Sequence, residues 1–405
     1  MTAVNDAPTT APPPPARTRR ADTNQRVARY GFWVVAAAAI GYAPLAVNYM
    51  WRYFVDGTVQ VQASVTSAID GHGYAVGYGS VDWARATAYE HDRWVMLIHT
   101  VLGGLCMVLG VMQFLPAVRR RWPRAHRWSG RVFLFAMTVS MLMAMVFLVD
   151  AGTVDFSMAS AFWLQLWALA LGSLATGWLG FAMIRNRNVV AHQGFMMQCF
   201  AFLMTAPGLR ALWVGLHPVF PRAVLLDNLG AGAVSEAILA PALGAAAFIL
   251  TRPERAARAA AAPDAASRAT YLWCGAVGLV AVAVTVVHGE LVLPADFPRE
   301  ILWTYFVPLA LAVGTTLAFA RRAHRAGRHT EERWWRYLLV GLVANVVLVN
   351  LTWVLGAIAV SQADAWLSSL FVTAAIPIVV AGTAIINDAS PRPLFARRRV
   401  AGATV

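Results

Sequence analysis

The sequence contains no lysine and few charged residues of any kind. All 33 basic residues are arginine, and charged residues make up 13% of the 405 residues, where a soluble domain has about 25%. Hydrophobic residues make up 59%, and the mean hydropathy is +0.57. A chain this apolar cannot cover a water-facing surface, which argues against a soluble enzyme, a disordered protein and a secreted disulfide scaffold. The composition predicts a polytopic membrane protein.

The absence of lysine and the small number of cysteines exclude several kinds of functional site. Without lysine the chain cannot carry a Walker-type phosphate loop. Its three cysteines, Cys106, Cys199 and Cys274, lie in apolar stretches and show no short Cys-x-x-Cys spacing. That pattern excludes a disulfide framework and a thiolate metal site, so we expect these cysteines to be small buried hydrophobic residues.

Apolar runs of membrane-spanning length recur along the whole chain. A spanning helix needs about 20 mostly apolar residues to cross about 30 Å of hydrocarbon. The sequence predicts an all-α transmembrane bundle of about ten helices, over residues 30–50, 94–116, 128–149, 158–184, 190–216, 229–251, 270–288, 301–320, 337–360 and 366–386.

Arginine placement predicts the orientation of this bundle. Most of the 33 arginines fall in the termini and in alternate connections, whereas the other connections carry mainly Asp and Glu. By the positive-inside rule both termini are cytoplasmic, and we expect a multi-pass protein of the inner (cytoplasmic) membrane. The arginine-rich loops are then expected to bind anionic lipid headgroups. No nucleic-acid partner is expected, because the basic loops are short and repeat at every cytoplasmic turn.

The spans divide into two units. We expect a small external cap from the long outside connection, 51–93, which is rich in Gly and aromatic residues. The expected division is a disordered cytoplasmic tail 1–28, a six-helix unit 29–251, a cytoplasmic linker 252–269, a four-helix unit 270–388 and a basic cytoplasmic tail 389–405.

Polar residues inside spans are costly in lipid and mark candidate sites. One group lies toward the outer surface: His99, Arg210 and Glu236. Arg210 and Glu236 fall at similar depth on consecutive antiparallel helices, so an ion pair between them is expected. This pair is either structural or, together with His99, a ligand or proton site.

A second group lies toward the cytoplasmic surface and contains Gln113, His126, Arg131 and His192. His126 and His192 are candidate axial ligands of a b-type haem, with Arg131 placed to pair with a propionate. The alternatives are interfacial residues that reach toward the headgroups, and proton or quinone chemistry. His217 lies 25 residues after His192, too far along one helix for both to lie inside the hydrocarbon core.

Several of these residues carry a family resemblance. The segment Trp94 to Glu236 resembles the bacterial predicted membrane proteins grouped as domain of unknown function 2306. In that family an early histidine precedes Gly-Pro-x-Gln-Phe, and here His99 precedes a run of 110–114 in which Val111 replaces the proline. His-Arg-x-x-Gly-Arg is intact at 126–131, and His-x-x-Trp-Met-x-Arg is similar to 192–198, where Phe195 and Gln198 depart from it. The resemblance implies an integral membrane protein without an agreed role.

Three functions are consistent with these residues. The first, which we take as the prediction, is a haem- or metal-binding redox or electron-transfer bundle that uses His126, His192 and His99. The second is a transporter or lipid-site protein with a His99, Arg210 and Glu236 pocket. The third is a non-catalytic scaffold or assembly factor in which polar residues fix the helix packing. The residues do not decide whether the protein is an enzyme.

Overall fold

In a computed structural model of the protein, the described residues are 21–153, 158–252, 266–295, 297, 299–391 and 394. Within these segments the regular elements are helices, and ten of them are long and apolar enough to cross a membrane. This result confirms the predicted all-α bundle with its ten spans. The helices imply a lipid bilayer as the surroundings.

Each predicted span corresponds to one helix or to one interrupted helix. Four shorter helices are α2 (Val61–Asp70), α3 (His72–Val76), α4 (Val81–His91) and α6 (Pro116–Arg121). The spanning helices are α1 (Ala21–Trp51), α5 (Arg93–Phe114), α7 (Pro123–Ala151), α8 (Ala159–Arg185), α9 (Val189–Leu203) with α10 (Thr205–Leu216), α11 (Leu225–Leu250), α12 (Ala266–Val292), α13 (Glu300–Arg325), α14 (His329–Gly356), and α15 (Gln362–Ser368) with the π-helix η1 (Ser369–Thr373) and α16 (Ala375–Ala389).

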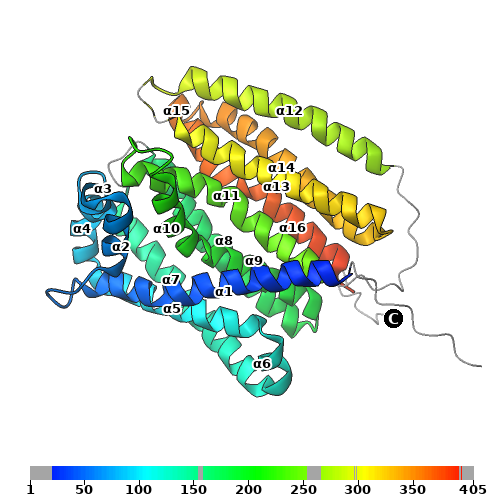
Figure 1. Ribbon diagram of the computed structural model, residues 1–405, viewed down its shortest axis with the longest axis horizontal. Helices are drawn as coiled ribbons and strands as arrows, with labels where there is room; N and C mark the ends of the chain where they lie inside the picture. Colours follow the sequence, from blue (N-terminus) through cyan, green and yellow to red (C-terminus); the bar gives the residue numbers. More distant parts are fainter. Residues whose placement is uncertain are drawn as a thin grey trace, which may run out of the picture.

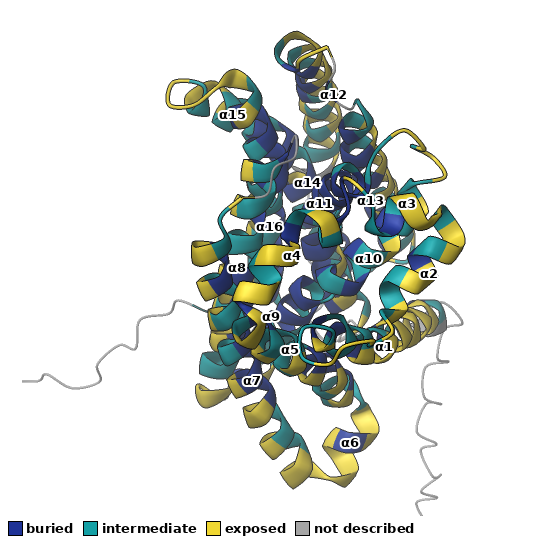
Figure 2. Cartoon of the chain, turned by 90° about the vertical axis from the view of Figure 1, so that its left-hand side faces the viewer, coloured by how far each residue is buried: buried dark blue, intermediate teal, exposed yellow. Residues whose placement is uncertain are grey.

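Helix α11 lies at the centre of the molecule and contacts helices that precede it and helices that follow it in the chain. It packs against α9 and α10 on one side and against α13, α14 and α16 on the other. The division of the spans into two units stays a prediction. Figure 2 shows dark, buried ribbon through the middle of the bundle at α11 and α14. The outer helix α12 packs mainly on α14 and exposes Leu272, Trp273, Leu279 and Leu291, the apolar side that lipid would cover.

Small residues let the central helices approach closely. Most of α11 consists of Ala, Gly and Leu. At Gly244 an added Cβ would lie 2.8 Å from Oε1 of Gln198 on α9 and 3.2 Å from Cβ of Ala201. Buried Gln198 also faces Gly382 on α16. Backbones that approach across Gly and Ala gain dispersion contacts, the main packing force between helices in lipid.

The long connection after α1 forms the cap, here defined as residues 52–92 with helices α2, α3 and α4. The cap covers the end of the bundle at which α1 ends (Figure 1), called the cap end below; the start of α1 lies at the opposite end. Tyr74 donates to the carbonyl of Trp213 at 2.7 Å and accepts from Asn228 at 2.9 Å. Arg85 donates to the carbonyls of Ala151 and Gly152, at the C-terminal end of α7. These bonds tie the cap to α7, α10 and α11.

The first helix starts earlier than expected. It begins at Ala21, so residues 21–28 of the predicted tail are helical. The cause is tertiary, because buried Asn24 donates to Oε1 of Glu331 on α14 at 2.9 Å. The rest of that tail, most of the predicted linker and most of the C-terminal tail lie outside the described residues. The cytoplasmic placement of the termini stays a prediction.

We expect Gly244→Leu to destabilise the protein, because a side chain there would enter the space of Gln198 and Ala201. Overpacking of this kind costs about 1–3 kcal/mol or more. The matched control is Gly275→Leu on α12, where an added Cβ meets nothing within 4 Å. Thermal unfolding in detergent measures both variants, and equal midpoints would contradict close packing at α11.

Candidate functional site

A cavity of about 280 Å³ lies at the cap end, between the cap and the helices α1, α5, α7, α8, α10 and α11. Its wall is mainly apolar. The titratable side chains on it are Tyr42, Tyr49, Asp82, Tyr89, His99 and Arg210. The structure thus brings together His99 and Arg210, two residues of the predicted outer group, and adds phenols and a carboxylate from α1 and the cap.

His99 is fixed by α7 in one tautomer. Its Nδ1 lies 2.8 Å from the backbone carbonyl oxygen of Ser140, and Ser140 Oγ donates to the His99 carbonyl at 2.9 Å. A carbonyl oxygen only accepts, so Nδ1 carries the ring proton. Nε2 is then a hydrogen-bond acceptor or metal ligand, and no described residue bonds to it.

Arg210 follows an interruption in its helix. Met204 separates α9 from α10, and Pro207 lacks the N–H that would bond the carbonyl of Leu203. The Arg210 guanidinium donates to the Ala206 carbonyl at 3.1 Å and lies over the rings of Tyr42 and Trp213, 5.3 Å from each centroid. Its Nε is buried and has no hydrogen-bond partner among the described residues. No carboxylate of the described residues pairs with it.

The predicted ion pair between Arg210 and Glu236 is therefore wrong. Glu236 on α11 faces Gly208, where an added Cβ would collide with the carboxylate. Residues 208 and 210 are two positions apart on a helix, about 200° around its axis at 3.6 residues per turn. Glu236 and Arg210 consequently lie on different sides of α10, and Glu236 does not line the cavity.

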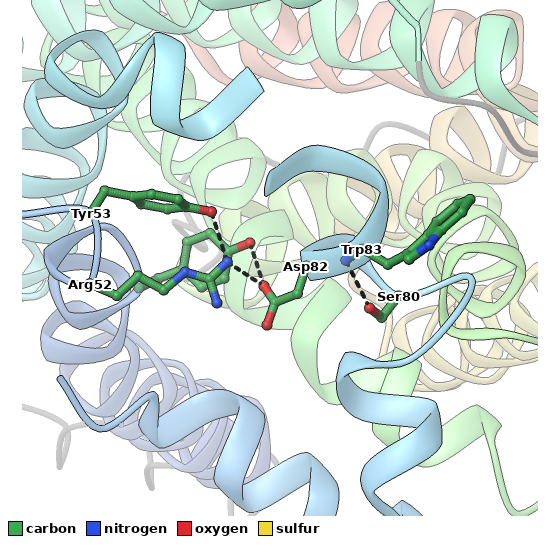
Figure 3. Close-up of polar contacts among 6 residues, drawn as sticks. Arg52, Tyr53, Ser80, Asp82 and Trp83 are labelled. Atoms are coloured by element: carbon green, nitrogen blue, oxygen red, sulfur yellow. Dashed lines mark hydrogen bonds and ion pairs between the residues drawn. The ribbon is translucent and has the colours of Figure 1, made fainter. Parts of the chain in front are cut away.

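The cap closes the cavity with an ion pair and aromatic rings. Arg52 lies 2.7 Å from Oδ1 of Asp82 and also donates to the hydroxyl of Tyr53, as Figure 3 shows. Tyr49 donates to the same Asp82 oxygen at 3.1 Å. The negative charge of Asp82 is thus balanced by Arg52, so it does not compensate Arg210.

Tyr89 of α4 supplies a free hydroxyl to the cavity wall. Its ring stacks on Phe147 with centroids 5.3 Å apart and meets Tyr49 edge-on at 5.5 Å. Burial raises the pKa of the Tyr89 phenol, and the nearby guanidinium groups of Arg85 and Arg210 offset part of that shift. The phenol is therefore protonated at neutral pH and is a hydrogen-bond donor beside Arg210.

At the opposite end, Gln113 and His126 form a contact between α5 and α7. The Gln113 amide, oriented so that both of its atoms are bonded, donates to Nδ1 of His126 at 2.9 Å and accepts from the Gly130 N–H at 3.2 Å. A Cβ at Gly130 would lie 3.3 Å from the Gln113 amide atom that faces His126. The residues of two resemblance motifs thus touch, and glycine leaves room for the amide. In this orientation of the amide, Nδ1 of His126 is the acceptor.

The other residues of that predicted group are placed separately. His192 donates from Nδ1 to the Gly180 carbonyl at 2.9 Å, which leaves Nε2 unprotonated, as in metal-bound histidines. Arg131 is exposed and lies over the ring of Trp128 at 5.0 Å. His192 has the tautomer of an axial haem ligand, and the haem site that also uses His126 and Arg131 stays a prediction.

Comparison with known proteins finds a family model that matches part of the chain. Residues 96–234 match the family described as predicted membrane protein DUF2306. The DUF2306 match runs from α5 to α11 and includes His99, Gln113, His126, Arg131, His192 and Arg210; Glu236 lies two residues beyond it. No curated protein and no solved structure matches the chain.

The cavity residues outside the DUF2306 segment carry no sequence signal that links them to it. Tyr42 and Tyr89 lie on α1 and α4, and only the folded cap brings them to Arg210. Two groups of potential metal ligands were also missed: within the described residues, His324, His329 and Glu332 converge, as do His91, Asp92 and Asp150. Neither cluster contains a histidine of the predicted haem or metal site.

We expect Asp82→Ala to loosen the cap, because it removes the bonds from Arg52 and Tyr49. Hydrogen bonds to charged groups are worth about 1.5–3 kcal/mol. Limited proteolysis should cut the cap of this variant faster than that of the wild type. Asp56→Ala, at an exposed cap position, is the control; the same rate in all three proteins would contradict a closing role for Asp82.

Proposed function

We propose that the protein binds a small amphipathic anion in the cavity at the cap end, as a transporter or a lipid-site protein. The observation that carries this proposal is the Arg210 guanidinium, which lies on the wall of a mainly apolar cavity inside a spanning helix and pairs with no described carboxylate.

The positive charge of Arg210 in the cavity favours a ligand with an anionic head group. A charged side chain inside a span is costly and commonly faces a partner or a functional cavity. Arg210 has one backbone carbonyl and two rings as partners, and Asp82 is already paired with Arg52. The guanidinium therefore retains donors for a carboxylate or phosphate, which it binds with matched geometry.

The remaining polar groups and the wall select the rest of the ligand. Tyr89 offers a donor and His99 Nε2 an acceptor, so a head with both kinds of group is held at several points. Met107, Phe147 and Leu203 line the cavity and offer an apolar surface to a short chain. A volume of about 280 Å³ is near the lower limit for small-molecule sites.

The interrupted helix supports a binding role. Discontinuous helices near the middle of membrane bundles build substrate sites in many transporters. Here the break at Met204 lies near the middle of the span Val189–Leu216. The cavity is lined by residues beside this break, namely Leu203, Thr205 and Ala206.

Haem or metal binding by the DUF2306 segment is the second candidate, supported by His192 alone. Its Nδ1–H bond to Gly180 leaves Nε2 free to ligate. The scaffold hypothesis is supported by Gln113, which joins α5 to α7 through His126 and Gly130. Both assign the function to the opposite end of the bundle.

We expect anionic selectivity to depend on Arg210. In nanodiscs of zwitterionic lipid, decanoate should raise the thermal midpoint of the wild type more than decanol does, because only the carboxylate can pair with the guanidinium. Arg210→Gln should weaken decanoate binding at least about tenfold, or about 1.4 kcal/mol. Arg222→Gln, at an exposed loop position, should leave it unchanged. Equal effects of decanoate and decanol on the wild type would refute the anion site.

An absorption spectrum separates the cavity proposal from the haem candidate. We expect purified protein, oxidised or reduced with dithionite, to show no Soret band that depends on His192. A band that is lost in His192→Ala and kept in His72→Ala would favour the haem candidate, since His72 is exposed in the cap.

A further inference from the structure

Three potential metal ligands meet at the turn between α13 and α14, at the end of the bundle opposite the cap. His324, His329 and Glu332 each direct one ligand atom into a group whose members all lie within 4.8 Å of one another. We propose that this group is a binding site for a divalent transition metal ion of the zinc class. It lies outside the DUF2306 segment and is independent of the cavity at the cap end.

The distances fit ligands of one ion. Nδ1 of His324 lies 3.0 Å from Oε2 of Glu332, and Nδ1 of His329 lies 3.8 Å from the same oxygen. Zn–N and Zn–O bonds of about 2.0–2.2 Å at tetrahedral angles place ligand atoms roughly 3.3–3.5 Å apart. The two observed distances, 3.0 Å and 3.8 Å, lie on either side of this separation. Both imidazoles turn the same nitrogen toward the carboxylate.

The turn holds the two histidines together. Gly327 has φ +68°, which glycine adopts without strain. The Arg328 N–H bonds to the Ala323 carbonyl at 2.9 Å, which brings the end of α13 onto the start of α14. His329 and Glu332 are three residues apart on α14 and therefore share a face. The ligand spacing is set by backbone geometry.

The neighbouring carboxylate has other partners. Glu331 accepts from Asn24 at 2.9 Å, pairs with Arg328 at 3.0 Å and accepts from Trp335 at 3.3 Å. Glu332 instead faces the histidines, and its side chain is only 6% exposed. The hydroxyl of Tyr271 on α12 donates to its other oxygen at 3.4 Å. Such an outer partner orients a ligating carboxylate.

The donor set selects the class of metal. Two imidazoles and one carboxylate suit zinc-like ions, whereas Mg²⁺ and Ca²⁺ prefer oxygen donors throughout. The His324 and His329 side chains are 56% and 30% exposed, so water can supply a fourth ligand. Arg321 and Arg325 are exposed nearby, where solvent and salt screen their repulsion of a cation.

A bound ion would fasten α13 to α14 beside the point where α1 contacts α14. The ligands come from α13 and α14, Tyr271 adds α12, and the adjacent Glu331 holds Asn24 at the start of α1. The ion would fix the first turn of α14, on which that contact to α1 depends. The role that follows is structural stabilisation of this end of the bundle.

Titration of the full chain tests the site. Detergent-purified protein is stripped with a chelator and titrated with Co²⁺, then with Zn²⁺ in competition. The wild type should bind one equivalent with the intense visible bands of four-coordinate cobalt. His329→Ala and Glu332→Gln should weaken binding at least about 100-fold, since even outer-partner changes cost 10–100-fold. Glu331→Gln, the adjacent carboxylate, and His91→Ala, from the other cluster, should keep the equivalent.

A second measurement separates lost ligands from lost folding. Zn²⁺ should raise the thermal midpoint of the wild type and of His91→Ala, because an ion that binds only the folded state stabilises it. It should not raise that of His324→Ala/His329→Ala, and a cooperative thermal transition of the metal-free double variant shows that this variant is folded. A wild type without the cobalt bands, or a tight equivalent that persists in the double variant, overturns the proposal.

Discussion

Close packing around α11 is the constraint on which the rest of the structure depends. This helix touches helices that precede it and helices that follow it in the chain, and its small residues allow α9 and α16 to come near enough for Gln198 to fit between Gly244 and Gly382. In lipid, apolar helices gain little by hiding from water, so the fit of backbones and side chains decides which helices associate. The positions of α9, α10, α13 and α16 all follow from that fit.

The cavity follows from the same arrangement. The end of α11 nearest the cap contributes Leu225 and Leu229 to its wall, and α10, which packs on α11, contributes Arg210. The cap completes the enclosure through bonds to the ends of α7, α10 and α11. Anion binding is thus proposed at the place where the cap, α1 and the DUF2306 segment meet, and all three supply groups to it.

Features that depend on a local run of residues could be predicted from the sequence. Contacts that depend on the direction of a side chain around its helix could not. The ten spans were predicted because a run of apolar residues is local. Arg210 and Glu236 were predicted to pair because they lie at similar depth in the membrane. Depth does not determine the side of the helix on which a side chain lies, and Glu236 faces Gly208 instead. The group of His324, His329 and Glu332 was missed, because no hydrophobic pattern marks the turn at Gly327 that brings these residues together.

The sequence by itself determined that this is a multi-pass helical membrane protein with most of its charge outside the spans, because the energy of a residue in lipid depends mainly on its own polarity. The tertiary structure decided which polar residues meet: His99 and Arg210 with Tyr89 at the cavity, Gln113 with His126 between α5 and α7. Those contacts join residues far apart in the chain. They depend on helix rotation and on the close approach that glycine permits, which no local pattern encodes.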